Sequence, residues 1–246
     1  APAGSNPYTG LIPSDTIGND IRRAAISIRW DLSEQTQGKI VFEPHVKAAI
    51  ENYAAAGAKV TAILSGVPAW ARDPLCPTNP YCAPAAGKGV FFGNFAGKGA
   101  VTFKGKIDTF VIHNEVDNAG WFTVCETCSL DQWVGRYAQS FNPAYDHIQH
   151  HAPGSHVLVS LTNAFFAGKT VPEPKTWSGA IPGEVFLKKF SEMVGNRAWK
   201  TGFHPYPVDM TAPTISADDA AHRMITMGNI GALEGWLVRT FPNKPS

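Results

Sequence analysis

The stretch that decides the fold is KIDTFVIHNEVDNAGW, residues 106–121. Residues 110–112 are uniformly apolar, which is typical of a strand buried on both faces of a parallel sheet. The sequence then changes at once to the polar residues His113, Asn114 and Glu115. Ligands bind at the carboxyl ends of the strands in parallel α/β folds. This stretch therefore predicts a buried strand whose end carries a functional carboxyl group.

Strand-like and helical patterns alternate on both sides of it. The predicted strands are residues 24–30, 59–65, 106–113, 156–162 and 199–203, and the predicted helices are residues 44–57, 129–151, 182–194 and 216–240. Residues 66–106 are rich in Gly and Pro and read as a long loop. The alternation predicts an α/β fold with a parallel sheet. Two architectures fit, an open doubly wound sheet or a barrel that lacks some of its eight strands.

Composition excludes several classes of protein. The chain has 246 residues, of which 44% are hydrophobic and 17% charged, so it is a folded domain and not a disordered tail. The net charge is +1, with Lys and Arg scattered, so no nucleic-acid partner is expected. No apolar run reaches eighteen residues, so no membrane partner is expected either. Composition leaves the oligomeric state open.

The four cysteines form two close pairs, Cys76 with Cys82 and Cys125 with Cys128. Two local disulfides in a secreted protein are the favoured interpretation. A zinc site with four thiolates and free thiols are the alternatives. The opening residues APAGS suit an end left by signal cleavage, although an arbitrary boundary explains them equally well.

The residues that follow the predicted strands are polar and aromatic. Candidate ligand-binding residues at these positions are Trp30, Trp70, Asn114, Trp121, Asn163, His204 and Tyr206. Aromatic rings of this kind stack on the apolar faces of sugars, although a Trp equally often fills a core. The pattern favours a polar cleft lined by stacking platforms.

Glu115 is the candidate catalytic residue. Trp121 and Phe122 follow it closely, so its carboxyl group is expected to be partly desolvated. Desolvation raises the pKa of a Glu and lets it hold a proton near neutrality, as a general acid requires. The alternative is an exposed Glu that forms a salt bridge in a turn.

Residues 110–121 (FVIHNEVDNAGW) resemble the end of strand four in the retaining glycoside hydrolases built on (β/α)8 barrels. The resemblance covers roughly residues 20–246. Residues 25–30 with Gly38, then 44–57 and 59–70, are similar to the second strand, second helix and third strand, which ends in a P-x-W turn, here residues 68–70. Residues 203–207 (FHPYP) are similar to the sixth strand. The resemblance implies that Glu115 is the acid/base and that Asn114 binds the sugar 2-hydroxyl.

The chain also departs from that family. The family's nucleophile is a Glu on strand seven, and the last residues here, 238–246, are similar to the lead-in to that strand. The first strand is not recognisable in residues 1–20. The expected fold is therefore an α/β, TIM-type barrel, incomplete, with strands two to six recognisable and residues 1–246 forming a single partial catalytic domain. Asp31 and Glu234 are poorly placed to be nucleophiles, so we expect the nucleophile beyond Ser246.

Three functions compete. The first is a glycoside hydrolase that acts on a poly- or oligosaccharide by retaining double displacement, with no metal or other cofactor. The second is a carbohydrate-binding barrel that lacks the nucleophile. A zinc hydrolase is disfavoured because the sequence contains no H-x-H or H-E-x-x-H pattern. His147, His150 and His151 are expected to lie on a solvated helix face. The sequence does not define the sugar, the linkage, or whether cleavage is exo or endo.

Overall fold

The computed structural model describes residues 22–124, 128–166, 180–207 and 224–242. Within them, five strands form one parallel sheet in the order β1-β2-β3-β4-β5. The strands are β1 (Arg23–Arg29), β2 (Lys59–Ser65), β3 (Ile107–Ile112), β4 (His156–Leu161) and β5 (Lys200–Phe203). Each strand pairs with the next one in the chain, as in a section of a barrel wall. The predicted α/β class and parallel sheet are thus confirmed.

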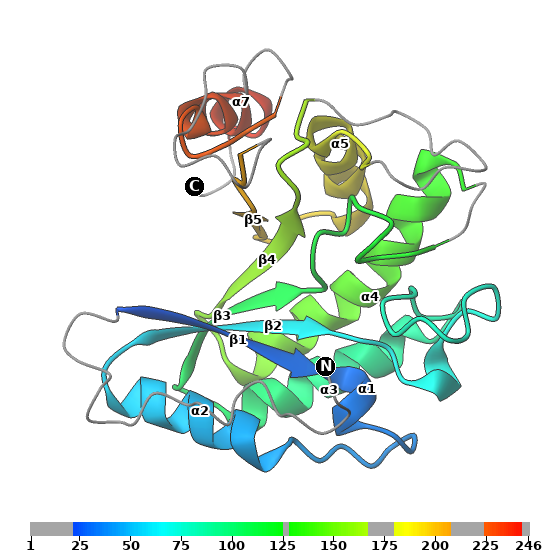
Figure 1. The fold of residues 1–246 in the computed structure, drawn as a ribbon, viewed down its shortest axis with the longest axis vertical. Coiled ribbons are helices and arrows are strands. Elements are labelled where there is room, and N and C mark those ends of the chain that lie inside the picture. Colours follow the sequence, from blue (N-terminus) through cyan, green and yellow to red (C-terminus); the bar gives the residue numbers. More distant parts are fainter. Residues whose placement is uncertain (1–21, 125–127, 167–179, 208–223, 243–246) are drawn as a thin grey trace.

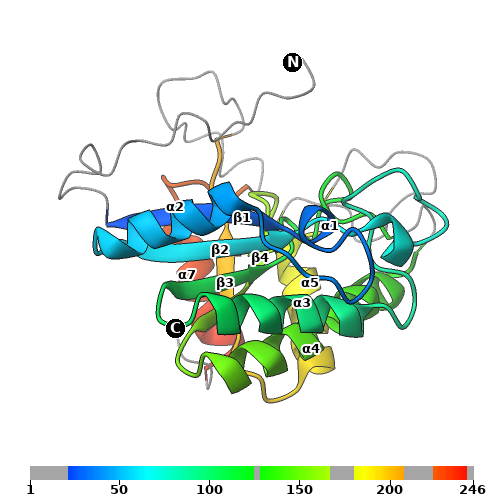
Figure 2. The same cartoon turned by 90° about the horizontal axis from the view of Figure 1, so that it is seen from below.

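Helices connect the strands and cover the sheet. They are α1 (Trp30–Ser33), α2 (Pro44–Ala55), the 3-10 turn η1 (Ala69–Ala71), α3 (Gly89–Thr102), α4 (Leu130–His151), α5 (Gly183–Val194) and α7 (Ile230–Thr240). The strands fan out from β1 to β5, and α7 lies at the β5 end of the sheet (Figure 1). In the view from below, α3 and α4 lie next to each other on one side of the strands (Figure 2). All five strands point their carboxyl ends toward the same edge, which we call the carboxyl edge.

Local sequence explains where the main elements begin. Pro44 stands at the first position of α2, where its missing N–H costs no hydrogen bond. Ser129 caps α4 in a capping box, because its hydroxyl accepts from the N–H of Gln132 and the Gln132 side chain accepts from the N–H of Ser129. In β3, residues 109–112 are all buried, as expected for a strand covered on both faces.

Helix α3 was not predicted, because its sequence GVFFGNFAGKGAVT contains four glycines. Glycine lowers intrinsic helix propensity, so the segment reads as a loop. The structure shows why glycines occur there. A Cβ at Gly89 would overlap with the carbonyl of Gln139, and one at Gly93 would lie 2.6 Å from Cβ of Pro143. Gly89, Gly93 and Gly97, spaced four apart, let α3 approach α4 closely, and this packing outweighs the loss of propensity.

The predicted helix at residues 216–240 is wrong in part. Of the described residues in this range, Ile230–Thr240 are helical and 224–229 are not, and residues 216–223 lie outside the described part of the chain. The backbone N–H of Thr226 donates to Oδ1 of Asn229 at 2.7 Å, and the N–H of Gly228 donates to Oγ1 of Thr226 at 3.3 Å. These side-chain bonds offer the backbone a turn in place of a helix.

The disulfide Cys76–Cys82 is present, which confirms the first predicted pair and contradicts the zinc and free-thiol alternatives for these two residues. The second predicted pair includes Cys125, which lies outside the described residues, so that pairing stays a prediction. Among the helices of the described residues, none combines the length and apolar character needed to cross a membrane.

Candidate active site at the carboxyl edge

Glu115 lies where β3 ends, in a turn with an unusual backbone. Its φ is 43° and that of His113 is 57°, a left-handed region that residues other than glycine rarely adopt. Such conformations cost free energy and are concentrated at functional sites. The N–H of Glu115 donates to Oγ of Ser160 at 3.3 Å, which ties the turn to the neighbouring strand β4. The residue is largely buried, with only 8% of its surface exposed.

His204, at the end of β5, faces Glu115. Its Nδ1 lies 3.2 Å from Oε1 of Glu115. Burial raises the pKa of Glu115 and lowers the pKa of His204, because both charged forms lose hydration. The pair therefore favours a protonated carboxyl group beside a neutral imidazole. A neutral Nδ1 can accept from the acid, or, as N–H, donate to the carboxylate, so His204 can partner Glu115 in both protonation states.

Asp117 is a second buried carboxyl group that sequence reasoning missed. It is 1% exposed and accepts hydrogen bonds from the N–H of Thr162 at 3.0 Å and from its hydroxyl at 2.8 Å. Burial raises the pKa of Asp117 to about 7, and the charge of Glu115 adds to the effect. The sequence feature that could have identified Asp117 is its position two residues after Glu115, after the end of the same buried strand. Asp117 is too buried to reach a substrate, and it holds the Glu115 turn against the end of β4.

His113 belongs to the core. Its ring stacks on Phe92, with centroids 4.2 Å apart, and it is almost fully buried. Burial lowers its pKa to about 3, so the imidazole is neutral at physiological pH.

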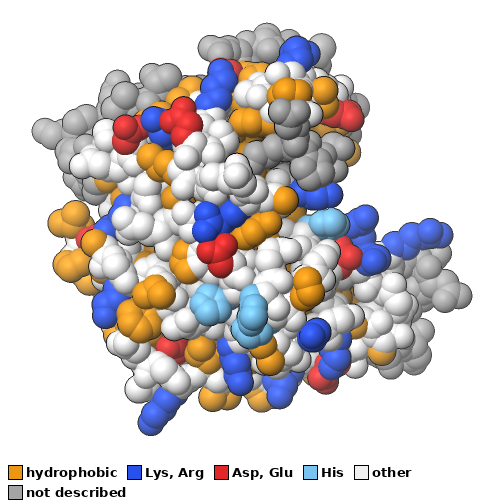
Figure 3. Space-filling view, turned by 180° about the vertical axis from the view of Figure 1, so that it is seen from behind, with side chains coloured by type: hydrophobic (Ala, Val, Ile, Leu, Met, Phe, Trp, Pro, Cys, Tyr) orange, Lys and Arg blue, Asp and Glu red, His pale blue; other side chains and the backbone are white. Residues whose placement is uncertain are grey.

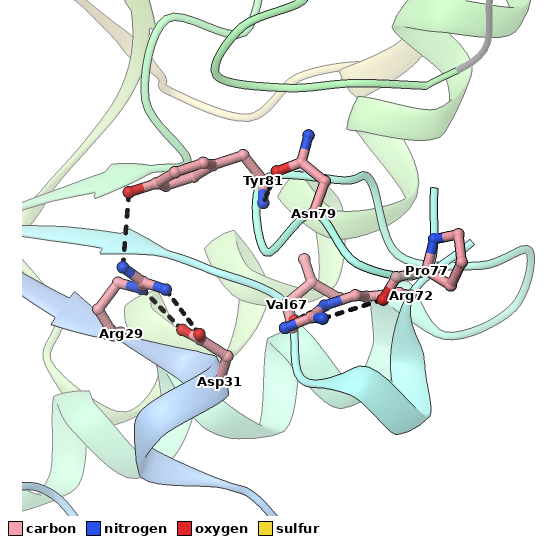
Figure 4. A network of polar contacts seen from close by, with 7 residues as sticks. All are labelled: Arg29, Asp31, Val67, Arg72, Pro77, Asn79 and Tyr81. Carbon is pink, nitrogen blue, oxygen red and sulfur yellow. Dashed lines mark hydrogen bonds and ion pairs between the residues drawn. The ribbon is translucent and has the colours of Figure 1, made fainter. Parts of the chain in front are cut away.

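A second polar group lies at the end of β1. Arg29 donates from Nε to Oδ1 of Asp31 at 2.7 Å and from Nη2 to Oδ2 at 2.6 Å, and its Nη1 lies 3.5 Å from the hydroxyl of Tyr81 (Figure 4). The bidentate geometry fixes the carboxylate in one orientation. Gly66, with φ +75°, leaves room for it, since a Cβ there would overlap with Asp31. Arg29 and Tyr81 were not predicted from the sequence.

Two of the predicted stacking residues serve structure. Trp30 is completely buried against Phe92 and Phe95, so it offers no ring face to a ligand and we reassign it to the core. Its Nε1 donates to Oε2 of Glu34 at 2.6 Å. Trp70 is partly buried and packs edge-on against Trp30, with its Nε1 donating to the carbonyl of Glu34 at 2.9 Å.

The other predicted residues lie around the carboxyl edge. Trp121 is 41% exposed and Tyr206 is exposed as well. The Tyr206 ring lies 5.7 Å from that of His204, and Asn163 donates from Nδ2 to the Tyr206 carbonyl at 2.8 Å. Asn114 is partly buried beside Glu115. The structure thus gathers Asn114, Glu115, Asn163, His204 and Tyr206 at the ends of β3, β4 and β5.

The described residues contain no group of three or more His, Cys, Asp or Glu side chains arranged to hold a metal ion. His147, His150 and His151 lie in the last turns of α4, with the His150 and His151 rings 4.6 Å apart.

The face of the molecule in Figure 3 shows Lys, Arg, Asp and Glu side chains interspersed, with no broad patch of one sign.

Solved structures share this fold. A hyperthermophilic β-glucosidase mutant aligns with a TM-score of 0.51 at 17% identity, over 78% of this chain and 54% of that protein. A GH5_18 protein from Streptomyces cattleya in complex with GlcNAc aligns at 0.48 and 13% identity, over 63% and 39% of the two chains. A family 39 glycoside hydrolase from Bacteroides cellulosilyticus aligns at 0.43 and 14%, over 56% and 26%. The first match shows that this chain shares part of a TIM-barrel-like fold.

This chain spans between 26% and 54% of the length of these proteins. No curated protein matches its sequence. The model of DUF5722, a family of unknown function, matches residues 95–245, and the chain belongs to that family. The matched region contains β3, β4 and β5 together with the residues that follow them, among them Glu115, Thr162 and His204.

Proposed function

We propose that this chain is part of a glycoside hydrolase that cleaves a poly- or oligosaccharide by retaining double displacement, with Glu115 as general acid/base. The observation that carries the proposal is the contact between Glu115 and His204 at the carboxyl edge. A buried carboxyl group with a raised pKa and a neutral hydrogen-bond partner suits proton transfer to a glycosidic oxygen. The shared barrel fold supports the same class of substrate.

In this mechanism Glu115 first protonates the leaving oxygen while a carboxylate attacks the anomeric carbon. The resulting Glu115 carboxylate then removes a proton from the water that releases the sugar. His204 receives or donates the hydrogen bond as the charge of Glu115 changes, and Asn114 is the proposed partner of the sugar 2-hydroxyl. We propose that the nucleophile lies beyond Ser246, because Asp31 and Asp117 are each held by two or more hydrogen bonds.

Three further proposals belong to this function. Residues 1–246 form a single partial catalytic domain, the partner is a carbohydrate, and the protein is secreted, which the Cys76–Cys82 disulfide supports. The second candidate function is a carbohydrate-binding barrel without a nucleophile. It is favoured because Asp31 and Asp117 are both held by hydrogen bonds and so are not free to act as nucleophiles. The residues that follow Ser246 in the gene distinguish the hydrolase from the binding barrel.

The test uses the full-length protein with Glu115→Ala and Glu115→Gln. We expect a loss of about 10²–10⁴-fold in kcat on an unactivated oligosaccharide, because proton donation contributes that much. An aryl glycoside with a good leaving group needs no acid, so its first step should survive, and azide should speed the second step of Glu115→Ala. Unchanged turnover of the oligosaccharide in both variants contradicts the proposal.

A further inference from the structure

The loop closed by the Cys76–Cys82 disulfide contacts the chain where β1 and β2 end. Tyr81, next to Cys82, extends from this loop toward Arg29 at the end of β1 (Figure 4). The loop is internally braced, because the N–H of Tyr81 donates to Oδ1 of Asn79 at 2.9 Å and Arg72 donates to the carbonyl of Pro77 at 3.0 Å. A loop fixed in this way can hold an aromatic ring in one place at the carboxyl edge.

This loop is also bonded to the segment that carries Trp121. The N–H of Thr123 donates to the carbonyl of Tyr81 at 3.0 Å, and the N–H of Ala83 donates to the carbonyl of Thr123 at 2.6 Å. Asn79 adds a bond from Nδ2 to the Thr123 hydroxyl at 3.2 Å. The disulfide loop and the segment after Glu115 therefore form one unit.

That unit presents two aromatic rings that are steeply inclined to each other. The Tyr81 and Trp121 rings lie 5.1 Å apart with an interplanar angle of 70°. The backbone N–H of Trp121 donates to the carbonyl of Asn118, and the backbone N–H of Asn118 donates to the carbonyl of Glu115 at 2.9 Å. The backbone that carries the exposed Trp121 ring is thus anchored to the turn with the candidate acid, and the ring does not belong to the core.

The side chains around Tyr81 and Trp121, which we call the aromatic corner, indicate the kind of ligand that would bind there. An indole face binds an apolar C–H surface, and the Tyr81 hydroxyl and the Arg29–Asp31 pair offer donors and acceptors beside it. The bidentate pair neutralises its own charge, so the aromatic corner favours an uncharged ligand. A neutral pyranose has both an apolar C–H face and a rim of hydroxyl groups.

We propose that Tyr81 and Trp121 form a subsite for a neutral pyranose unit, separate from the unit that reacts at Glu115, and that the Cys76–Cys82 disulfide holds this subsite in shape. The inference rests on the proposed function in taking carbohydrate as the ligand. It extends that function by assigning a second sugar-binding position, and so a preference for oligosaccharides over single sugars.

The test measures binding without turnover. Cellopentaose, xylopentaose and mannopentaose are titrated by calorimetry into the full-length protein carrying Glu115→Gln. Trp121→Ala and Tyr81→Ala should each weaken the binding of the preferred pentaose by roughly tenfold or more, since buried aromatic contacts dominate such sites. Leu75→Ala is the matched control, because Leu75 belongs to the same loop, is 76% exposed and should leave affinity unchanged.

The double variant Cys76→Ser, Cys82→Ser should weaken pentaose binding in the same direction, with circular dichroism and thermal unfolding verifying that the fold persists. Trp121→Phe, which keeps an aromatic ring, should retain part of the affinity. The inference is overturned if no pentaose binds, or if Trp121→Ala binds as tightly as the parent. Binding that depends on Trp121 in a protein without hydrolase activity contradicts the proposed reaction and leaves this subsite standing.

Discussion

The two edges of the sheet differ in what holds their charged groups. At the carboxyl edge, Glu115 and Asp117 are buried and held by bonds from neighbouring strand ends. At the opposite edge, a hollow of about 560 Å³ is lined by Lys59, Lys104, Lys106 and Asp108, among others. There the ion pairs are exposed, as in Lys106 with Glu51 at 3.0 Å and Lys59 with Asp108 at 3.1 Å.

This difference shows that a buried carboxyl group indicates a functional site better than an exposed ion pair does. An exposed pair contributes little and needs no special backbone. A buried carboxyl group costs free energy and persists only where the surrounding structure compensates for it. The left-handed backbone at His113 and Glu115 adds a further cost in conformational free energy. The exposed ion pairs of the opposite edge carry no such cost. Burial and strain therefore locate the candidate site better than the size of a hollow does.

The largest effect is expected from Asp117→Ala. At pH 5.5 the Asp117 carboxyl group is mostly protonated, so the substitution removes hydrogen bonds and leaves the Thr162 N–H buried without its partner. We expect a loss of roughly 3 kcal/mol in the free energy of unfolding. Urea unfolding measures it, with Asp108→Ala at the opposite edge as control. Equal losses in the two variants contradict the contrast between the edges.

Much of this fold was predictable because strands and caps obey local rules. The apolar residues 109–112, Pro44 at the start of α2 and the Ser129 capping box are each decided by nearby sequence. Helix α3 was not predictable in this way. Its glycines make sense only once α4 lies against it, and that contact joins residues about fifty positions apart. Local propensity and tertiary packing disagree there, and packing prevails.

The second largest effect is expected from Gly66→Ala. The residue has φ +75°, and an added methyl group would overlap with the Asp31 carboxylate. The control is Gly57→Ala, where φ is +80° and nothing lies within 4 Å. We expect Gly57→Ala to cost about 1 kcal/mol for its backbone alone and Gly66→Ala to cost about 1–2 kcal/mol more. Thermal unfolding compares them, and equal losses would show that Asp31 moves aside freely.

The site was less predictable than the fold, for a physical reason. The position of Glu115 after β3 follows from the change from apolar to polar residues, so the sequence predicts where this carboxyl group lies, and its catalytic role stays a prediction. Trp30 follows a strand in the same way but turns into the core, because α1 begins at that residue. Tyr81 and Arg29 meet across 52 positions, and no spacing in the sequence reveals a contact of that kind.

A third prediction concerns His113. Its folded-state pKa of about 3 lies below the ordinary value of 6.5, so the unfolded chain binds this proton more readily. Its contribution to stability is therefore complete above pH 6.5 and is lost as the pH falls toward 3. At pH 5 the loss from this group should be about 2 kcal/mol. His113→Asn tolerates the left-handed backbone and should remove that slope, as measured by urea unfolding from pH 7.5 to 4.5. A parallel pH dependence in the two proteins contradicts the prediction.

The smallest effect belongs to the ion pair at the opposite edge. Lys59 is 65% exposed at its side chain, so its bond to Asp108 competes with water and salt. A double-mutant cycle with Lys59→Met and Asp108→Asn should give a coupling of about 0.2–1 kcal/mol that shrinks in 1 M NaCl. Burial alone would raise the pKa of Asp108, but bonds from Lys59 and Thr109 outweigh it and lower the pKa.

The sign of its pH dependence separates Asp108 from Asp117. A lowered pKa means that the contribution of Asp108 is present above its ordinary pKa of 3.8 and is lost as the pH falls through the folded value. A raised pKa means that the charge of Asp117 reduces stability progressively as the pH rises from about 4 to about 7. Compared with the parent, Asp108→Asn should change the pH dependence of unfolding below about pH 4, and Asp117→Asn should change it between about pH 4 and 7, with slopes of opposite sign. Two slopes of the same sign would mean that burial does not raise the pKa of carboxyl groups at the carboxyl edge. The proposal that Glu115 keeps its proton near neutrality and acts as a general acid would then lose its physical basis.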